Sequence, residues 1–294
     1  MGVTIRAALI SEGFMTWPLY VAQGRGLFAA HGLEVSLTVT GSSVKQLDAL
    51  QAGSFDVGFQ LPDHVVRAVE RGSDLFIFMA QAEAPDVSLV ARQEFTQIAA
   101  LRGHSIAVDG ARSGYALLLR RLLAAQGLSS ADCPLLEIGG VKERAEALAQ
   151  CRAAASLLNP PFDRQLLAKG YVRLASTRQA FPTYPGPIGA ARRAWAREQH
   201  ATLAAFIRAY RDACRWLAAP ANAGAAADIA CARLKTDRAA AEEAVAEFLN
   251  RPPPQITPAG LREVIDVVWQ ADGLAPPQGE PERYMDLSYL DRAG

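Results

Sequence analysis

The chain has 294 residues, of which 50% are hydrophobic and 20% charged, a composition typical of a globular protein with room for two domains. Lys and Arg together number 30, as do Asp and Glu, so the formal net charge is zero, which argues against a nucleic-acid binder or a polybasic membrane-surface protein. No apolar run approaches the roughly 18 residues that a membrane span needs.

The cysteines and histidines form no recognisable motif. The four cysteines contain no CxxC pair, and the four histidines make no HExxH cluster. We therefore expect buried free thiols rather than a disulfide framework, and no metal site. The N-terminal residues MGVTIRAALI enter a strand almost directly and show no signal peptide, which predicts either a cytoplasmic chain or one whose leader has been removed.

The first 80 residues alternate strands with helices. Apolar runs predict strands at four places, residues 3–10, 33–39, 55–59 and 75–80. Helix-start signals follow the first three strands, at Thr16-Trp17-Pro18, Gly41-Ser42-Ser43 and Gln60-Leu61-Pro62-Asp63. Short loops and right-handed crossovers then predict a parallel sheet. The loops that end strands and begin helices meet at one edge of such a sheet, so we expect a pocket there.

Residues 104–176 predict a second, smaller α/β unit, with a strand at 87–93 leading into it. Its first strand, 106–108, is followed by a Ser/Gly loop and a helix with a single apolar stripe, which Gly127 ends. Unpaired backbone N–H groups at that helix start, beside the positive end of the helix dipole, favour an anion. The alternative is that Ser113 only caps the helix.

The rest of the chain is mostly helical. The segment FPTYPGP (181–187) is stiff and is predicted to be a linker. A long amphipathic helix is expected over 195–217, two further helices over about 222–249, and another from Thr257-Pro258 to Gly273. Residues 274–294 are rich in Pro and Gly and are expected to wrap the surface.

Several stretches together carry a family resemblance. They are, in order, PLYVAQGRGLFAAHGLEV, SSVKQLDALQAGSFDVGF, LRGHSIAVDGARSGYALLLRRLLAAQGL, SLLNPPFDRQLLAKGYVRLAS, FIRAYRDACRWLAAPAN and YMDLSYLDRAG. In them the chain resembles the NMT1/THI5-like and SsuA-like solute-binding proteins, which have the type II periplasmic-binding-protein fold. The resemblance implies two α/β lobes with a ligand cleft between them. Lobe 1 would comprise residues 1–90 and 185–294, and lobe 2 the inserted residues 91–184.

The resemblance also implies a function. The chain would be the solute-binding component of an ABC importer, with a small anionic ligand (a sulfonate, nitrate or carboxylate) or an aromatic or heterocyclic one. Its partners would be that ligand and a membrane permease, with no nucleic acid, no membrane insertion, no cofactor and no metal. The expected location is the periplasm, with the cytoplasm as the alternative. Closure of the lobes would follow because the ligand binds both of them.

Candidate ligand-binding residues follow from their positions at strand ends and helix starts. In lobe 1 they are Thr16, Trp17, Ser42, Ser43, Gln60 and Gln81. In lobe 2 and the linker they are Arg112, Ser113, Gly114, Tyr115, Asn159, Phe162 and Tyr184. Two hydroxyl-bearing helix starts facing each other would suit an anion, and the aromatic rings would sandwich a flat ligand.

Each of these assignments has a structural alternative. Trp17 is equally suited to packing under its own helix, and Asn159 to a turn before two prolines. Arg112 is alternatively a solvated loop charge, and Glu12 is an alternative partner for an amine ligand.

An enzyme of the same fold is the alternative function. The superfamily includes cytoplasmic proteins that resemble pyrimidine-precursor synthases and small-molecule decarboxylases. The synthase-like members carry a cysteine-rich run and a lysine that holds pyridoxal phosphate. Here the lysines are Lys45, Lys142, Lys169 and Lys235, and only Lys45 lies at a cleft-edge helix, without a recognisable cofactor site. No catalytic triad or paired carboxylate is evident at the cleft loops, so no catalytic residue is assigned.

Overall fold

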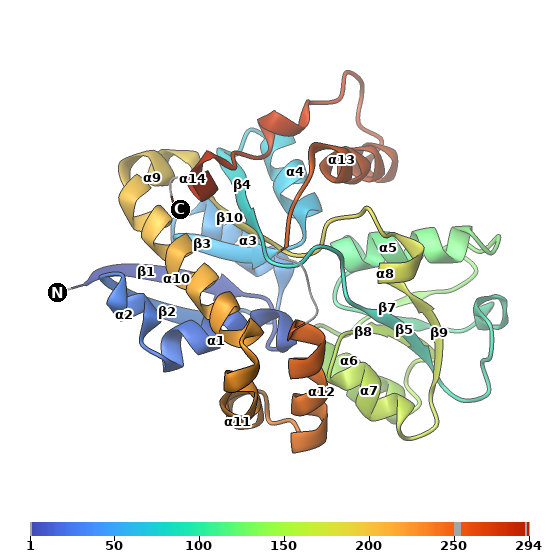
Figure 1. Cartoon of the computed structure of the whole chain (residues 1–294). Coiled ribbons are helices and arrows are strands. Elements are labelled where there is room, and N and C mark those ends of the chain that lie inside the picture. Colours follow the sequence, from blue (N-terminus) through green and yellow to red (C-terminus); the bar gives the residue numbers. More distant parts are fainter. Residues whose placement is uncertain (1, 250–253, 292, 294) are drawn as a thin grey trace.

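The computed structural model describes residues 2–249, 254–291 and 293. Two five-stranded sheets, each flanked by helices, form two lobes that lie side by side (Figure 1). The strand order is β2-β1-β3-β10-β4 in the first sheet and β7-β6-β8-β5-β9 in the second. In the described part of the chain, no helix is both long enough and apolar enough to span a bilayer.

The first sheet contains the four expected strands and one that was not expected. Its strands are β1 (Val3–Leu9), β2 (Leu33–Val39), β3 (Val57–Gln60), β4 (Leu75–Ala80) and β10 (Ile188–Arg192). β1 pairs parallel with β2 and β3, whereas β10 runs antiparallel between β3 and β4. The expected parallel pairing is confirmed for β1, β2 and β3, and β10 adds an antiparallel strand that was not predicted. Its small residues fit a crowded position, since a Cβ on Gly189 would lie 2.7 Å from Phe78.

Helices of the first lobe come from both ends of the chain. They are α1 (Trp17–Gly24), α2 (Leu27–Ala30), α3 (Ser43–Gln51), α4 (Pro62–Glu70), α9 (Arg193–Glu198), α10 (His200–Ala218), α11 (Ala223–Leu234), α12 (Arg238–Leu249), α13 (Pro258–Asp272) and α14 (Ser288–Asp291). The single helix expected over 195–217 is divided at Gln199, which has non-helical dihedral angles. Phe206 and Tyr210 of α10 each lie with their ring centroids 6.2 Å from that of Phe59 in β3, so α10 covers one face of the sheet.

The second lobe is the inserted unit. Its strands are β5 (Ser88–Ala91), β6 (Ile106–Val108), β7 (Leu135–Glu137), β8 (Ala155–Leu158) and β9 (Val172–Ser176). Its helices are α5 (Gly114–Ala124), α6 (Val141–Ala149), α7 (Phe162–Leu167) and α8 (Thr177–Ala180). β5 runs antiparallel to both of its neighbours. The chain enters the second sheet through β5 and returns to the first through β10. Each of these two strands runs antiparallel to its neighbours.

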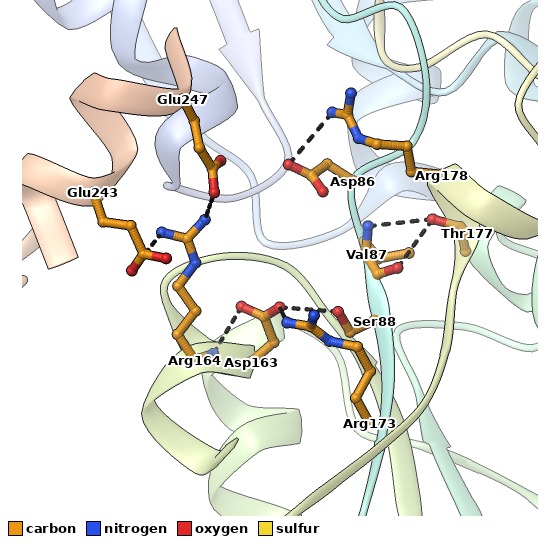
Figure 2. Close-up of polar contacts among 10 residues, drawn as sticks. All are labelled: Asp86, Val87, Ser88, Asp163, Arg164, Arg173, Thr177, Arg178, Glu243 and Glu247. Carbon is orange, nitrogen blue, oxygen red and sulfur yellow. Dashed lines mark hydrogen bonds and ion pairs between the residues drawn. The ribbon is translucent and has the colours of Figure 1, made fainter. Parts of the chain in front are cut away.

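Two crossing segments, residues 81–87 and 177–187, connect the sheets and lie against each other. The backbone N–H of Gln81 donates to the carbonyl of Pro187 at 2.8 Å. The buried hydroxyl of Thr177 donates to the carbonyl of Pro85 at 2.7 Å. It also accepts from the N–H of Val87 at 3.2 Å (Figure 2). The expected lobe boundary at 184 lies within the second crossing, whereas the one at 90 falls within β5, which belongs to the second sheet.

Candidate functional site

A small cleft lies where loops of the two lobes meet. The first lobe contributes the loop after β1, the start of α3 and the ends of β3 and β4, while the second contributes the start of α5 and the end of β8. The cavity has a volume of about 70 Å³. Its lining residues are Leu9, Ile10, Ser11, Glu12, Gly13, Met15, Thr16, Ser43, Phe59, Gln60, Leu61, His64, Gln81, Asp109, Gly114, Tyr115, Asn159 and Pro187.

Two glutamine side chains in this cleft lack hydrogen-bond partners. Gln60, at the end of β3, is 2% exposed, and neither its Oε1 nor its Nε2 bonds to any described residue. Gln81, just after β4, is 8% exposed, and its Nε2 is likewise without a partner in the described structure. A buried amide without a partner costs about 1–3 kcal/mol per group. Both amides are therefore placed to bond to a molecule that enters the cleft.

The two helix starts expected to bind an anion use their serines as caps. Ser42 accepts from the backbone N–H of Lys45 at 3.3 Å at the start of α3. Ser113 accepts from the N–H of Ala116 at 3.1 Å and donates to Asp109 at 2.6 Å. Neither serine lines the cleft, although the next residue in each case, Ser43 or Gly114, does. The capping alternative therefore describes both hydroxyls.

The cleft is lined by the carboxylates of Glu12 and Asp109 and by the basic imidazole of His64. Glu12 accepts a hydrogen bond from the hydroxyl of Tyr20 at 3.1 Å, and Asp109 accepts from Ser113. Among the described residues no Lys or Arg belongs to the lining. Arg112 lies outside it, with its side chain 72% exposed and 3.7 Å from Asp272. It matches the solvated alternative more closely than the ligand-binding one.

The expected aromatic sandwich does not assemble. Trp17 is fully buried against Phe14 and Phe248, with ring centroids 5.6 and 5.8 Å away. Tyr184 is also fully buried, in a hydrophobic cluster that contains residues of both lobes, and Phe162 packs on a small core cluster of the second lobe. Of the four rings proposed from the sequence, Tyr115 is the one in the cleft lining.

A buried group of charges, which we call the Arg67 cluster, closes one edge of the lobe boundary. It consists of Arg67, Asp63, Asp272 and the carbonyl of Arg112. Arg67 donates to Asp63 at 2.7 Å, to Asp272 at 2.8 Å and, across the boundary, to the Arg112 carbonyl at 3.1 Å. Burial raises the pKa of Asp63, whose Oδ1 bonds to no described residue.

Gly114 fits tightly against the same aspartate. A Cβ at Gly114 would overlap Asp63 Oδ1 and would lie 2.7 Å from a methyl group of Leu61. Gly114 begins α5 in the second lobe, whereas Leu61 and Asp63 belong to the first. The absence of a side chain at Gly114 therefore permits the lobes to approach as closely as they do.

A second group of charges, the Arg164 cluster, lies at the opposite edge and joins α7 to α12. Arg164 pairs with Glu243 at 3.1 Å and with Glu247 (Figure 2). The two glutamate side chains are 60% and 40% exposed. Beside Arg164, Asp163 accepts from the hydroxyl of Ser88 at 3.0 Å, which fixes the start of α7 to β5.

A larger cavity of about 710 Å³ lies along α10 and adjoins the cleft at Met15 and Gln81. Much of its wall is apolar, with Tyr210, Cys214 and Leu287 among the lining residues. Three arginines also line it, and each already has a partner: Arg178 with Asp86, Arg211 with the carbonyl of Leu290, and Arg215 with Asp212. The buried side-chain amide of Gln60, which has no partner among the described residues, lines the smaller cleft and makes it the better candidate site.

Two sheets in this order, joined by paired crossing segments with a cleft between the lobes, define the type II periplasmic-binding-protein fold. The sequence profile of the NMT1-like family matches residues 13–231, and the chain belongs to that family. No curated protein matches the sequence significantly.

Solved structures agree on the fold. A ligand-binding component of an ABC-type import system from Staphylococcus aureus, with zinc bound, has a TM-score of 0.80 and 16% identity, and the match covers 99% of each chain. The alkanesulfonate-binding protein SsuA from Xanthomonas axonopodis pv. citri, bound to MOPS, has a TM-score of 0.77 and 20% identity over 97% of this chain and 98% of that one. The nitrate-binding protein NrtA from Synechocystis has a TM-score of 0.81 and 14% identity over 99% and 88%.

Some residues at the site were not proposed from the sequence. His64, Asp109 and Ser11 line the cleft, and Asp63 lies against Gly114 at its edge. Asp109 directly follows β6 and His64 lies in the first turn of α4. Their positions at a strand end and a helix start are the same signals that identified Gln60 and Gly114, so a wider selection by position would have included them.

Proposed function

We propose that this protein is the solute-binding component of an ABC importer and that it holds a small solute in the cleft between its lobes. The observation that carries the proposal is Gln60, a buried amide with both polar atoms unpartnered among the described residues, in a cleft lined from both lobes. The similar folds of a ligand-binding component of an ABC-type import system, an alkanesulfonate-binding protein and a nitrate-binding protein support the same role. A membrane permease would be the partner and the periplasm the location.

The proposed ligand contacts are the predicted residues that line the cleft: Thr16, Ser43, Gln60, Gln81, Gly114, Tyr115 and Asn159. Of the two ligand classes expected from the sequence, a heterocycle with hydrogen-bonding groups suits them better than an anion. Amide side chains both donate and accept, whereas an anion needs donors alone and is stabilised by Lys or Arg. The enzyme alternative receives no support from Lys45, which is exposed and outside the lining.

Mass spectrometry of the small molecules released on denaturation tests the proposal. We expect the purified protein to release one solute in stoichiometric amount. The Gln60→Ala variant should release at least about tenfold less, since the loss of one or two hydrogen bonds in a dry site weakens binding by that order. Gln51→Ala, on the exposed end of α3, is the matched control and should release as much as the wild type.

Two results would contradict the proposed function. One is a protein that releases no solute on denaturation and whose small-angle scattering does not change when the small-molecule fraction of a cell extract is added. The other is a bound molecule that is converted to a product over time, which would favour an enzyme.

A further inference from the structure

The charged groups that line the cleft indicate the charge of the solute, an inference that rests on the proposed function. Asp109 and Glu12 both line the cavity, and the described lining holds no Lys or Arg to oppose them. Asp109 accepts from Ser113 through Oδ1, while its Oδ2 bonds to no described residue. An anion placed here would meet two negative charges in a site with little water, where Coulomb repulsion is stronger than in bulk solvent.

Two basic side chains bear on this argument, His64 in the lining and Arg144 behind it. Arg144 is 4% exposed and interacts electrostatically with Asp109 from behind the cleft wall. Its guanidinium donates to the carbonyl of Gly139 at 2.6 Å and to that of Leu157 at 3.2 Å. Because those carbonyls already accept its N–H groups and Arg144 is absent from the lining, it moderates the negative charge without offering a contact to an anion. The two carboxylates, Glu12 and Asp109, therefore carry more charge than Arg144, and His64 is the one basic group among the described lining residues.

Gln60 supplies an independent indication that a polar group of a ligand belongs here. The amide is almost completely buried, lines the same cavity and finds no partner for either polar atom in the described chain. Its oxygen can accept from an N–H donor, as can both carboxylates. A ligand with several N–H donors would therefore satisfy the amide oxygen and the acids together.

We propose that the solute carries a small, positively charged nitrogen group, such as an amidinium or a protonated amino-heterocycle, which Asp109 holds by a charge-assisted hydrogen bond. Gln60 accepts from a second N–H of the same group, and Glu12 adds negative potential at the cleft. The site is thereby selective for cations within a family fold whose compared structures include a sulfonate-binding and a nitrate-binding protein.

Two series of isosteric probes test this selectivity by NMR titration or calorimetry: acetamidinium, acetamide and acetate, and the larger benzamidinium, benzamide and benzoate. Members of each series share shape and differ in charge. We expect the amidinium to bind at least about tenfold more tightly than the carboxylate in at least one series, since a charge-assisted hydrogen bond is stronger than a neutral one and the carboxylate would be repelled. The neutral amide should fall between them.

The Asp109→Asn variant removes the charge but keeps an oxygen that can accept from Ser113. It should reduce the preference for the amidinium at least about tenfold, which corresponds to about 1.4 kcal/mol. Asp132→Asn is the matched control, because Asp132 also accepts from a serine hydroxyl, that of Ser129 at 2.7 Å, but lies outside the cleft lining. It should leave the preference unchanged.

Three outcomes would overturn the inference. They are equal or tighter binding of the carboxylates, a preference for amidinium that survives in Asp109→Asn, and failure of all probes to bind at about 10 mM, where a fragment of this size should be detectable in a suitable site. None of them removes the proposed transport role, which the released solute tests separately. A sulfonate or nitrate found as that solute would support transport and overturn the cationic class.

Discussion

The two edges of the lobe boundary use similar residues in different surroundings. In the Arg67 cluster the arginine is 7% exposed, and its carboxylate partners are 0% and 10% exposed. In the Arg164 cluster the arginine is 18% exposed, but its glutamate partners are largely in water. Charges in water lose little when they separate, whereas a buried charge that loses its partner remains desolvated. The two edges should therefore differ greatly in energy despite their similar geometry.

This difference bears on how the lobes move. The Arg67 cluster is mostly internal to the first lobe, since Asp63, Arg67 and Asp272 lie on α4 and α13, and it touches the second lobe through the Arg112 carbonyl and Gly114. All ion pairs of the Arg164 cluster cross the boundary. We infer that the buried edge is a fixed stop against which the second lobe closes, and that the exposed edge is a contact that forms and breaks at little cost.

The largest effect is expected from removal of the buried arginine. Arg67→Met should lower the free energy of unfolding by about 3–5 kcal/mol, because Asp63 and Asp272 would remain buried without their counter-charge. Urea denaturation measures it. Arg71→Met, at the exposed end of the same helix, is the control and should change stability by less than about 0.5 kcal/mol. If Arg67→Met lowers the free energy of unfolding by less than about 1 kcal/mol, the proposed energetic difference between the two edges is wrong.

Gly114→Ala should act on closure rather than on the fold. The added methyl group overlaps Asp63 and Leu61 of the other lobe, so the variant can relieve the clash by opening the cleft. We expect binding of the released solute to weaken about tenfold or more, since a less populated closed state lowers the apparent affinity in proportion. Alanine is a better helix former than glycine, so thermal stability should be retained.

The control for that variant is Gly24→Ala, because Gly24 lies in the last turn of α1 and an added Cβ would meet nothing within 4 Å. Small-angle scattering with saturating solute should show the closed form for Gly24→Ala and a more open form for Gly114→Ala. Wild-type affinity and scattering for Gly114→Ala would mean that α5 can shift without opening the cleft.

The positions of these elements and the parallel pairing of β1, β2 and β3 were predictable from the sequence, but the antiparallel direction of β5 and β10 was not. Apolar runs and helix-start signals located β1 to β4 and the beginnings of α3, α4 and α5. The antiparallel strands β5 and β10 depend on where the chain returns from the other lobe, which is a tertiary property. Locally, IGAAR after a Pro-Gly-Pro segment is equally compatible with a linker and with a strand.

At the site the sequence located loops better than individual side chains. A helix start predicts that a cap and a first-turn residue lie at the cleft edge, but not which of the two faces the ligand. Ser42 and Ser113 are caps, and their neighbours Ser43 and Gly114 line the cleft. The rings of Trp17 and Tyr184 lie in the core because their backbone positions direct them there, and an apolar ring carries no local signal that separates core from cleft.

The pH dependence of stability offers a sharper test of the buried edge. Burial raises the folded-state pKa of Asp63 above its unfolded value of about 3.9. Between those two values the folded state binds more protons than the unfolded state, so the free energy of unfolding falls as the pH rises through this window. Asp63→Asn lacks this titration. Its stability relative to the wild type should therefore increase with pH, by on the order of 1 kcal/mol for each unit of raised pKa.

Urea denaturation of both proteins between about pH 4 and pH 8 measures that difference, with Asp48→Asn as the exposed control. The control should show no comparable trend with pH. A difference between Asp63→Asn and the wild type that stays constant, or that decreases with pH, would show that the pairing of Asp63 with Arg67 outweighs its burial.

The smallest effect is expected at the exposed edge. Arg164→Met should lower the free energy of unfolding by at most about 1 kcal/mol, because Glu243 and Glu247 regain water when the pair is lost. The solute affinity of the wild type and that of Arg164→Met should also differ less as salt is raised from 50 mM to 500 mM. The reason is that ionic screening weakens exposed ion pairs. Calorimetric titrations of both proteins at the two salt concentrations measure this. Two results would mean that both edges are fixed and that closure involves movement elsewhere in the crossing segments. One is a loss of stability as large as that of Arg67→Met, and the other is a difference in solute affinity that salt does not change.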